Sequence, residues 1–144
     1  MESMKGRWVA IASGPSLTTD DCELIRASGL PTVVTNTTYQ RCPWAHALYA
    51  MDVKWWAHYH EEVKRDFTGK RLGWSAIVTK YGAESMQGRM VGFGNPGTDA
   101  VAYAMSQGAT EVLMLGYDCG ATGGKSHWHG DHPKNLSNAS SIAR

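Results

Sequence analysis

The stretch RWVAIASGPSL, residues 7–17, decides the fold. Residues 7–12 form a mostly apolar run that is typical of a buried strand, and a Gly-Pro-Ser turn at 14–16 ends it before a helix begins. Such a turn presents backbone N–H groups to an anion, because glycine permits close approach and the serine hydroxyl lies near the next helix N-terminus. The alternative is a plain strand-to-helix connection that contacts no ligand.

Strands and helices alternate along the rest of the chain. β-branched or apolar runs predict further strands at 31–36, 45–51, 71–74, 90–93 and 111–118, the last one buried and the 71–74 and 90–93 strands separated by a loop. Capping residues and helical spacing predict helices at 18–28, 53–67 and 95–107. This alternation predicts an α/β, Rossmann-like fold with a mostly parallel sheet and helices on both faces.

The composition limits the classes of function. The 144 residues predict one domain, and 14 basic against 13 acidic residues give a net charge of +1, too little to recruit nucleic acid or a membrane. The three cysteines include no CxxC pair, which indicates reduced thiols and not a disulfide framework or zinc knuckle. No apolar stretch is long enough to span a membrane and no signal peptide begins the chain, so we expect a cytoplasmic protein. Its oligomeric state stays open.

The C-terminal part of the chain is the hardest to interpret. A polar loop is expected at 119–135, and a last helix begins at Leu136 shortly before the chain stops at Arg144. We therefore expect that the domain, 1–144, is either truncated at its C-terminus or ends in a short element.

Polar residues follow the predicted strands where each strand ends. The Ser13–Ser16 turn, Asn36, Asp52 and Asp118 all occupy such positions, and Asn95 opens the helix at 95–107. Ligands of open α/β sheets bind outside the carboxyl ends of the strands, and a helix N-terminus favours an anion. These residues therefore predict one shared cleft. The alternatives are that strand ends are polar because they meet solvent, and that Asn95 only caps its helix.

The segment KSHWHGDHP, residues 125–133, contains the other chemical motif. His127, His129, Asp131 and His132 match the HxHxDH pattern of the metallo-β-lactamase superfamily, and would hold zinc or another divalent metal. However, a polar Gly-rich loop precedes the motif and no further ligand follows it. Two other interpretations are histidines that act as acid or base over the cleft, and a polar surface loop.

In their order, the segments at 11–17, 35–39, 95–97 and 115–118 resemble two related groups of proteins. One is the bacterial lipooligosaccharide sialyltransferases of glycosyltransferase family 42. The other is a domain of unknown function that includes 6-hydroxymethyl-7,8-dihydropterin pyrophosphokinases. Similar His-Trp-x-Gly-Asp-His-Pro loops are familiar from bacteriophage genomes, so we expect a phage-encoded member that acts in the host cytoplasm.

The resemblance and the strand ends together imply a set of nucleotide contacts. This set is Ser13, Gly14, Pro15, Ser16, Asn36, Asn95, Gly97, Thr98, Tyr117 and Asp118. The resemblance also implies that a histidine of the 125–133 loop, His132 or His129, is the general base.

The expected function is a nucleotide- or nucleotide-sugar-binding transferase, similar to a sialyltransferase, that acts on a hydroxyl acceptor. One alternative is a pyrophosphokinase-like enzyme whose Mg²⁺ is held by Asp52 and Asp118. Two further alternatives are a non-catalytic nucleotide-binding phage protein and a metal-dependent hydrolase that uses the HxHxDH residues.

Overall fold

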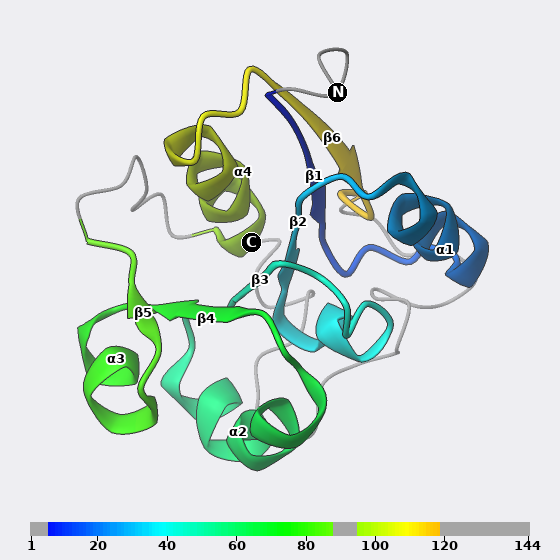
Figure 1. The fold of residues 1–144 in the computed structure, drawn as a ribbon. Helices are drawn as coiled ribbons and strands as arrows, with labels where there is room; N and C mark the ends of the chain where they lie inside the picture. Colours follow the sequence, from blue (N-terminus) through cyan, green and yellow to red (C-terminus); the bar gives the residue numbers. More distant parts are fainter. Residues whose placement is uncertain (1–5, 88–94, 119–144) are drawn as a thin grey trace.

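The computed structural model describes residues 6–87 and 95–118, which form an α/β fold around one parallel sheet (Figure 1). The strands are β1 (Arg7–Ile11), β2 (Thr32–Thr35), β3 (Ala47–Tyr49), β4 (Lys70–Gly73), β5 (Glu84–Ser85) and β6 (Glu111–Leu115). The helices are α1 (Thr19–Ser28), the 3₁₀ helix η2 (Asn36–Gln40), α2 (Val53–Asp66), α3 (Ser75–Tyr81) and α4 (Pro96–Ser106). The strand order is β5-β4-β3-β2-β1-β6. The predicted fold class is confirmed.

The direction of chain winding reverses beside β1. Strands β1 to β5 are added one after another on the same side, whereas β6 returns to the other side of β1 after α4. β6 pairs with β1 in parallel from Arg7 opposite Glu111 to Ile11 opposite Leu115. The carboxyl ends of β1 and β6 therefore form the topological switch point of the sheet, the place where open α/β sheets bind ligands.

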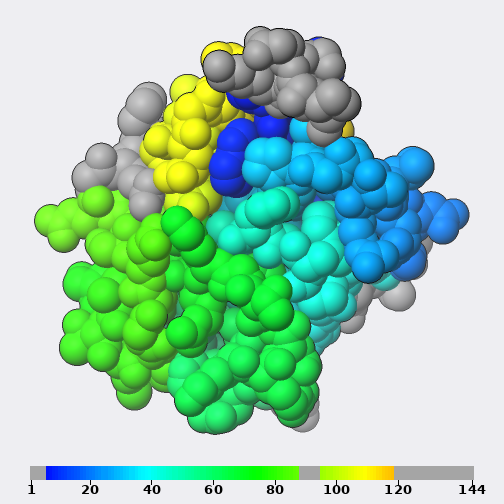
Figure 2. Space-filling view, in the orientation of Figure 1, coloured from blue at the N-terminus to red at the C-terminus, as the bar shows by residue number. Residues whose placement is uncertain are grey.

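Each face of the sheet has its own core. On one face, α1, η2, α2 and α3 bury a cluster rich in aromatic side chains, among them Tyr39, Trp55 and Trp56. On the other face, α4 places Ala100 and Ala104 against the sheet. Figure 2 shows α4 (yellow) in space-filling form beside the blue segment of β1, with which it packs. Right-handed crossovers place helices on opposite faces on either side of a switch point, which explains this division.

The predicted helix boundaries are confirmed where capping residues define them. Thr18 accepts a hydrogen bond from the Asp21 N–H at 3.1 Å and begins α1. Gly29 ends α1 with a φ of 72°, in the left-handed region that glycine adopts at no steric cost. Asp52 accepts a bond from the Lys54 N–H at 2.8 Å and begins α2.

The segment between β4 and β5 corrects one prediction. A loop was expected after residue 74, but the structure contains α3 and then the short strand β5. Three consecutive β-branched residues, Ile77, Val78 and Thr79, lower the helix propensity of this segment. Tertiary packing overrides that preference, because Ile77 is 2% exposed and the left-handed Gly82 caps the helix. The predicted strand at 90–93, the loop at 119–135 and the helix from Leu136 lie outside the described residues.

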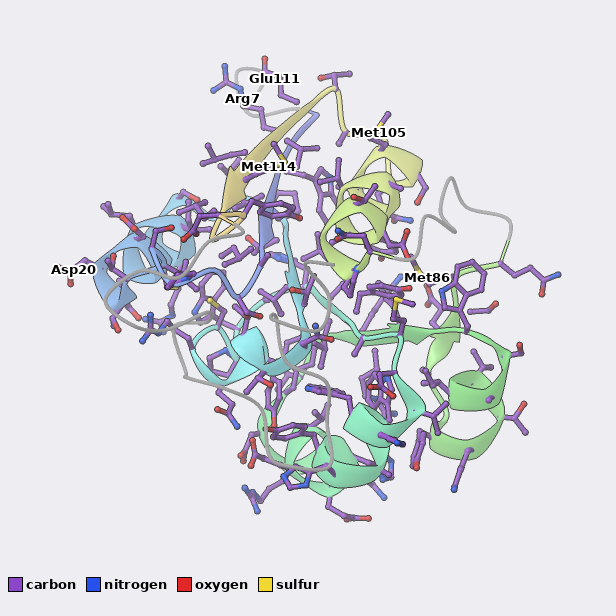
Figure 3. All side chains as sticks on the ribbon, turned by 180° about the vertical axis from the view of Figure 1, so that it is seen from behind. Arg7, Asp20, Met86, Met105, Glu111 and Met114 are labelled. Carbon is purple, nitrogen blue, oxygen red and sulfur yellow. The ribbon has the colours of Figure 1, made fainter. Side chains whose placement is uncertain are left out.

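Strand β6 corrects a second prediction. Its sequence indicated a buried strand, yet Leu113 is 53% and Met114 is 55% exposed. Among the described residues β6 pairs only with β1, and Met114 lies on this outer strand in Figure 3. At its start, Glu111 forms an ion pair with Arg7 across the two strands at 3.4 Å. An apolar run alone does not distinguish a central strand from an edge strand.

Candidate functional site

The Gly-Pro-Ser turn and the end of β6 meet at the switch point. The Ser16 hydroxyl donates to Asp118 Oδ1 at 2.6 Å, and the Ser16 N–H donates to Asp118 Oδ2 at 3.3 Å. Below this contact, the Gly14 N–H donates to the Gly116 carbonyl oxygen at 2.6 Å. The structure therefore joins two of the predicted strand ends, although these residues lie about a hundred positions apart in the sequence.

Gly14 is required at this position by close packing. A Cβ atom on Gly14 would lie 2.2 Å from Asp118 Oδ1 and 2.4 Å from the Gly116 carbonyl oxygen. Real Cβ atoms essentially never approach other atoms so closely, so a side chain would push the turn away from β6. Gly116 itself has a φ of 70°, which glycine alone adopts readily. Pro15, which follows Gly14 in the turn, is half-buried.

The turn is also fixed to the end of β2. The buried hydroxyls of Ser13 and Thr38 are hydrogen-bonded at 3.0 Å. Asn36 follows β2 with a φ of 50°, the one positive φ of a non-glycine residue in the described ranges. Asparagine tolerates the left-handed region better than most residues, and such outliers concentrate at functional sites. Ser13 and Asn36 therefore lie on neighbouring strand ends, as predicted.

The start of α4 lies against the residues that follow β6. The Tyr117 hydroxyl donates to the Gly97 carbonyl oxygen at 2.7 Å, and a Cβ on Gly97 would lie 2.9 Å from the Tyr117 ring. Burial raises the pKa of Tyr117, so it remains a neutral donor. Asn95 caps the helix by accepting the Gly97 and Thr98 N–H groups at 2.8 and 3.3 Å. Asn95 therefore caps α4 and accepts the N–H groups that were assigned to an anion.

A buried polar network at the ends of β3 and β4 was missed from the sequence. The Tyr49 hydroxyl donates to Asp99 Oδ2 at 2.8 Å and accepts from Trp74 Nε1 at 2.8 Å. Asp99 is 1% exposed and lies in the first turn of α4, where the helix dipole favours a carboxylate. Burial raises the pKa of Tyr49 and the bond to Asp99 raises it further, against the effect of Trp74. The sequence does place an acidic residue, Asp99, in the first turn of a predicted helix. It contains no pattern that would predict the hydrogen bond of Asp99 with Tyr49.

The two carboxylates proposed for Mg²⁺ lie on distant strands. Asp52 follows β3 and Asp118 follows β6, so three strand spacings, about 14 Å, separate their strands. Each is also engaged locally, Asp52 as the cap of α2 and Asp118 by Ser16. One Mg²⁺ with ligands at about 2.1 Å does not bridge them. Shared magnesium coordination by these two residues is therefore not supported.

The second predicted metal site is not described by the structure. Within residues 6–87 and 95–118, no group of three or more His, Cys, Asp or Glu side chains could hold a metal ion. The histidine motif lies outside these ranges, together with both candidate general bases. Its residues are His127, His129, Asp131 and His132.

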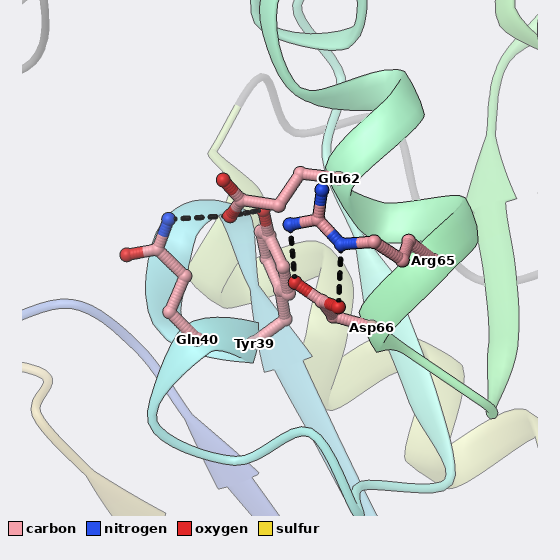
Figure 4. Close-up of polar contacts among 5 residues, drawn as sticks. All are labelled: Tyr39, Gln40, Glu62, Arg65 and Asp66. Atoms are coloured by element: carbon pink, nitrogen blue, oxygen red, sulfur yellow. Dashed lines mark hydrogen bonds and ion pairs between the residues drawn. The ribbon is translucent and has the colours of Figure 1, made fainter.

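A surface hollow of about 480 Å³ lies between η2 and α2, and none of its lining residues belongs to the predicted site. Figure 4 shows the polar contacts among its lining residues. Glu62 accepts hydrogen bonds from the Tyr39 hydroxyl and, at 2.6 Å, from Gln40 Nε2. Arg65 and Asp66 form a two-pronged ion pair with both distances at 2.9 Å. Burial raises the pKa of Tyr39, and its bond to Glu62 raises it further, so Tyr39 remains a donor. These polar groups satisfy one another, which leaves the hollow without a distinct ligand chemistry.

Known proteins give no further guide to this site. No family model matches the chain, and no curated protein and no solved structure matches it. None of the described helices is long and apolar enough to cross a membrane. The resemblance to sialyltransferases and pyrophosphokinases therefore stays a prediction, and the geometry of the strand ends carries the functional argument.

Proposed function

We propose that the protein binds a nucleotide or nucleotide-sugar at the carboxyl ends of β1 and β6, and transfers a group from it to a hydroxyl acceptor. The contact between Ser16 and Asp118 carries this proposal. It brings a glycine-containing turn, a hydroxyl and a carboxylate together at the topological switch point, where sheets of this kind bind ligands.

The chemistry of Asp118 favours a ribose. A carboxylate offers about four acceptor sites. Two hydrogen bonds from Ser16 orient the group and leave it capacity for the hydroxyls of a sugar. Asp118 is only half-buried, so a ligand can approach it. Gly14 supports the same role, because the absence of a side chain there keeps the turn in contact with the carboxylate.

The start of α4 is the proposed place for the phosphates. The dipole of the helix and its first N–H groups favour an anion. In the described structure Asn95 accepts two of these N–H groups, so a phosphate would replace the Asn95 carbonyl oxygen as their acceptor. Tyr117 fixes this helix start beside the end of β6, which supports one continuous site from Asp118 to Gly97.

In the proposed transfer, a histidine of the 125–133 segment is the general base. His132 or His129 would take the proton of the acceptor hydroxyl while its oxygen attacks the transferred group. The negative charge that develops on the departing nucleotide phosphate would be stabilised by N–H groups and by the dipole of α4. Both steps depend mainly on the positioning of the reacting groups.

Binding is tested first, by calorimetry and thermal shift with CMP, a CMP-sugar, and ATP with Mg²⁺. We expect a cytidine nucleotide to bind without metal, and Asp118→Asn to weaken it about 10- to 100-fold through loss of charge-assisted hydrogen bonds. Asp66→Asn is the matched control, since it neutralises an exposed carboxylate on α2 far from the switch point and should leave the affinity unchanged.

The remaining outcomes separate the alternatives. If no nucleotide binds, or if Asp118→Asn binds as tightly as the wild type, the proposed site is wrong. Binding that requires both ATP and Mg²⁺ would favour a kinase. Binding without turnover of any sugar nucleotide would favour a non-catalytic module. For a transferase, His132→Ala or His129→Ala should retain nucleotide affinity and abolish turnover.

A further inference from the structure

Strand β6 exposes apolar side chains on the side of the sheet that α4 covers. Met114 is 55% exposed, and it faces this side because its partner on β1, Ala10, belongs to the core under α4. Val112 and its partner Trp8 pack against the same core and are half-buried. Within the described ranges, no strand pairs with the outer edge of β6.

One side of α4 continues this apolar surface. Gly97, Val101 and Met105 are spaced four residues apart, so they form one stripe along the helix. The stripe faces β6, because Gly97 at its start contacts Tyr117, which follows that strand. Figure 3 shows Met105 on α4 and Met114 on β6. The apolar side chains on these two sides form what we call the β6 patch, which consists of Val101, Met105, Val112 and Met114.

The sequence of β6 is typical of a strand that is covered on both faces. Its residues 111–115, EVLML, include four apolar residues in a row, as in parallel strands that are buried on both sides. Soluble proteins rarely leave contiguous apolar patches open, and an unpaired strand edge invites a further chain segment. The β6 patch is therefore an interaction surface.

A segment of the same chain is the best-placed occupant. Residues 136–144, LSNASSIAR, have four apolar side chains at helical spacing, namely Leu136, Ala139, Ile142 and Ala143. The connection of residues 119–135 is long enough to reach any part of the five-residue strand β6, since an extended chain gains about 3.3 Å per residue. A tethered segment has an effective concentration of about millimolar, far above that of a second copy in dilute solution.

The winding of the sheet favours the α4 side for this segment. The chain crosses to β6 through α4, and a chain that continues outward from β6 keeps to the same face, because parallel crossovers are right-handed. Leu113 is exposed to a similar degree as Met114 but faces the opposite side, because its partner Val9 belongs to the other core. Met114 and not Leu113 should therefore contact the segment.

We propose that residues 136–144 dock as a short helix on the β6 patch, with their apolar side against Met105 and Met114. A helix of this length is marginal alone in water, so it would form by packing on the patch. Docking would also hold the histidine segment, residues 125–133, at both of its ends. The inference does not depend on the proposed nucleotide, because it concerns contacts within the chain alone.

The test uses pairs of introduced cysteines in the full chain with Cys119→Ser, whose remaining native cysteines, Cys22 and Cys42, are buried. The variant with Met114→Cys and Ile142→Cys is oxidised mildly, digested with trypsin without reduction and examined by mass spectrometry. We expect a disulfide between the tryptic peptides 90–125 and 135–144 of one chain in most of the molecules.

The matched control combines Leu113→Cys with Ile142→Cys. Both strand positions are adjacent and similarly exposed, so a loose tether would link them equally well. Docking on the α4 side should give at least about fivefold less disulfide from position 113, because successive side chains of a strand point to opposite faces. Equal yields would overturn the proposal. A disulfide between two chains from position 114 would also overturn it and would assign the patch to a second copy.

Hydrogen exchange of the unmodified chain tests the same contact without any substitution. We expect the amides of residues 136–144 to exchange at least about tenfold more slowly than those of a synthetic peptide of residues 135–144. The amides of β1 serve as the internal control for a folded protein. Exchange of the segment at the rate of the free peptide, while β1 remains protected, would overturn the proposal even if the cysteine variants do not fold.

Discussion

The two faces of the sheet differ in the size of the side chains that their helices bury. The face under α1, η2 and α2 is filled by large aromatic rings, with Tyr39, Trp55 and Tyr59 in edge-on or tilted contact. The face under α4, called the alanine face after the small side chains of its helix, also holds tyrosines and other larger side chains, and it buries a carboxylate, Asp99. The aromatic face thus gains stability by burying a large apolar area. On the alanine face, the small side chains let α4 lie close to β1 and β2. The free energy of unfolding should therefore fall when a buried side chain of the aromatic face is truncated, and also when a buried alanine of α4 is enlarged.

Trp56→Ala tests the aromatic face and should have the largest effect. Trp56 is fully buried, donates from Nε1 to the Ala50 carbonyl oxygen at 2.8 Å and stacks on Tyr81. Its removal leaves a cavity and an unpaired carbonyl group, and we expect the free energy of unfolding to fall by about 3–5 kcal/mol. Urea or guanidinium titration measures it. A loss below about 1 kcal/mol would mean that this face is not the main core.

Ala100→Leu tests the alanine face by enlargement. Ala100 is fully buried on α4, so three extra carbon atoms would force the helix away from the sheet. We expect a loss of about 1–3 kcal/mol in the free energy of unfolding. Met105→Leu on the same helix is the control, because Met105 is 46% exposed and its substitution should change stability by less than about 0.5 kcal/mol. Equal effects of the two changes would remove the distinction between the faces.

Tyr49→Phe tests the polar network buried under α4. The change removes one hydroxyl, so Trp74 Nε1 loses its acceptor and Asp99 loses a donor while the ring packing is kept. We expect a loss of about 1–2 kcal/mol, measured by the same titrations. Tyr81→Phe is a suitable control, since it removes a tyrosine hydroxyl from a half-buried ring on the opposite face. A Tyr49→Phe variant as stable as the wild type would show that the network adds nothing to stability.

The pH dependence of stability gives the smallest effect. The folded-state pKa of Tyr49 is raised, chiefly by burial, above the ordinary value of about 10. The folded protein therefore binds the proton more tightly than the unfolded chain, so this contribution is complete below about pH 10 and is lost as the pH rises further. The slope should be at most about 1.4 kcal/mol per pH unit for this group and should disappear in Tyr49→Phe. Identical slopes in both proteins above about pH 10 would contradict this assignment.

The sequence predicted the parts of the fold that depend on local signals. Thr18, Gly29 and Asn95 marked helix ends correctly, because a cap requires a particular residue type at one position. Helix α3 was missed because its local propensity opposes its conformation and only packing of Ile77 decides it. The exposure of β6 was missed for a similar reason, since the order of strands across the sheet is a tertiary property.

In the candidate site too, some features were predictable from the sequence and others were not. Gly14 and Asp118 were each identified from strand ends, and the parallel topology brought them together. Their direct contact through Ser16 depends on atomic detail that no sequence pattern contains. The pairing of Tyr49 with Asp99 was not predictable, because the two residues lie on elements that meet only after folding.

The position of β6 beside β1 has a consequence for the order of assembly. Strand β1 pairs with β2 on one side, but its partner on the other side is β6, whose register starts at Glu111, opposite Arg7. Contacts of such sequence separation form late, because the entropy of closing a long loop is lost before the contact contributes. During synthesis, strands β1 to β4 and the aromatic face can associate before β6 is made. The contact between Ser16 and Asp118 can form only afterwards. Among the described strands β6 is the last, so the core under α1, η2 and α2 can form before the candidate site is complete.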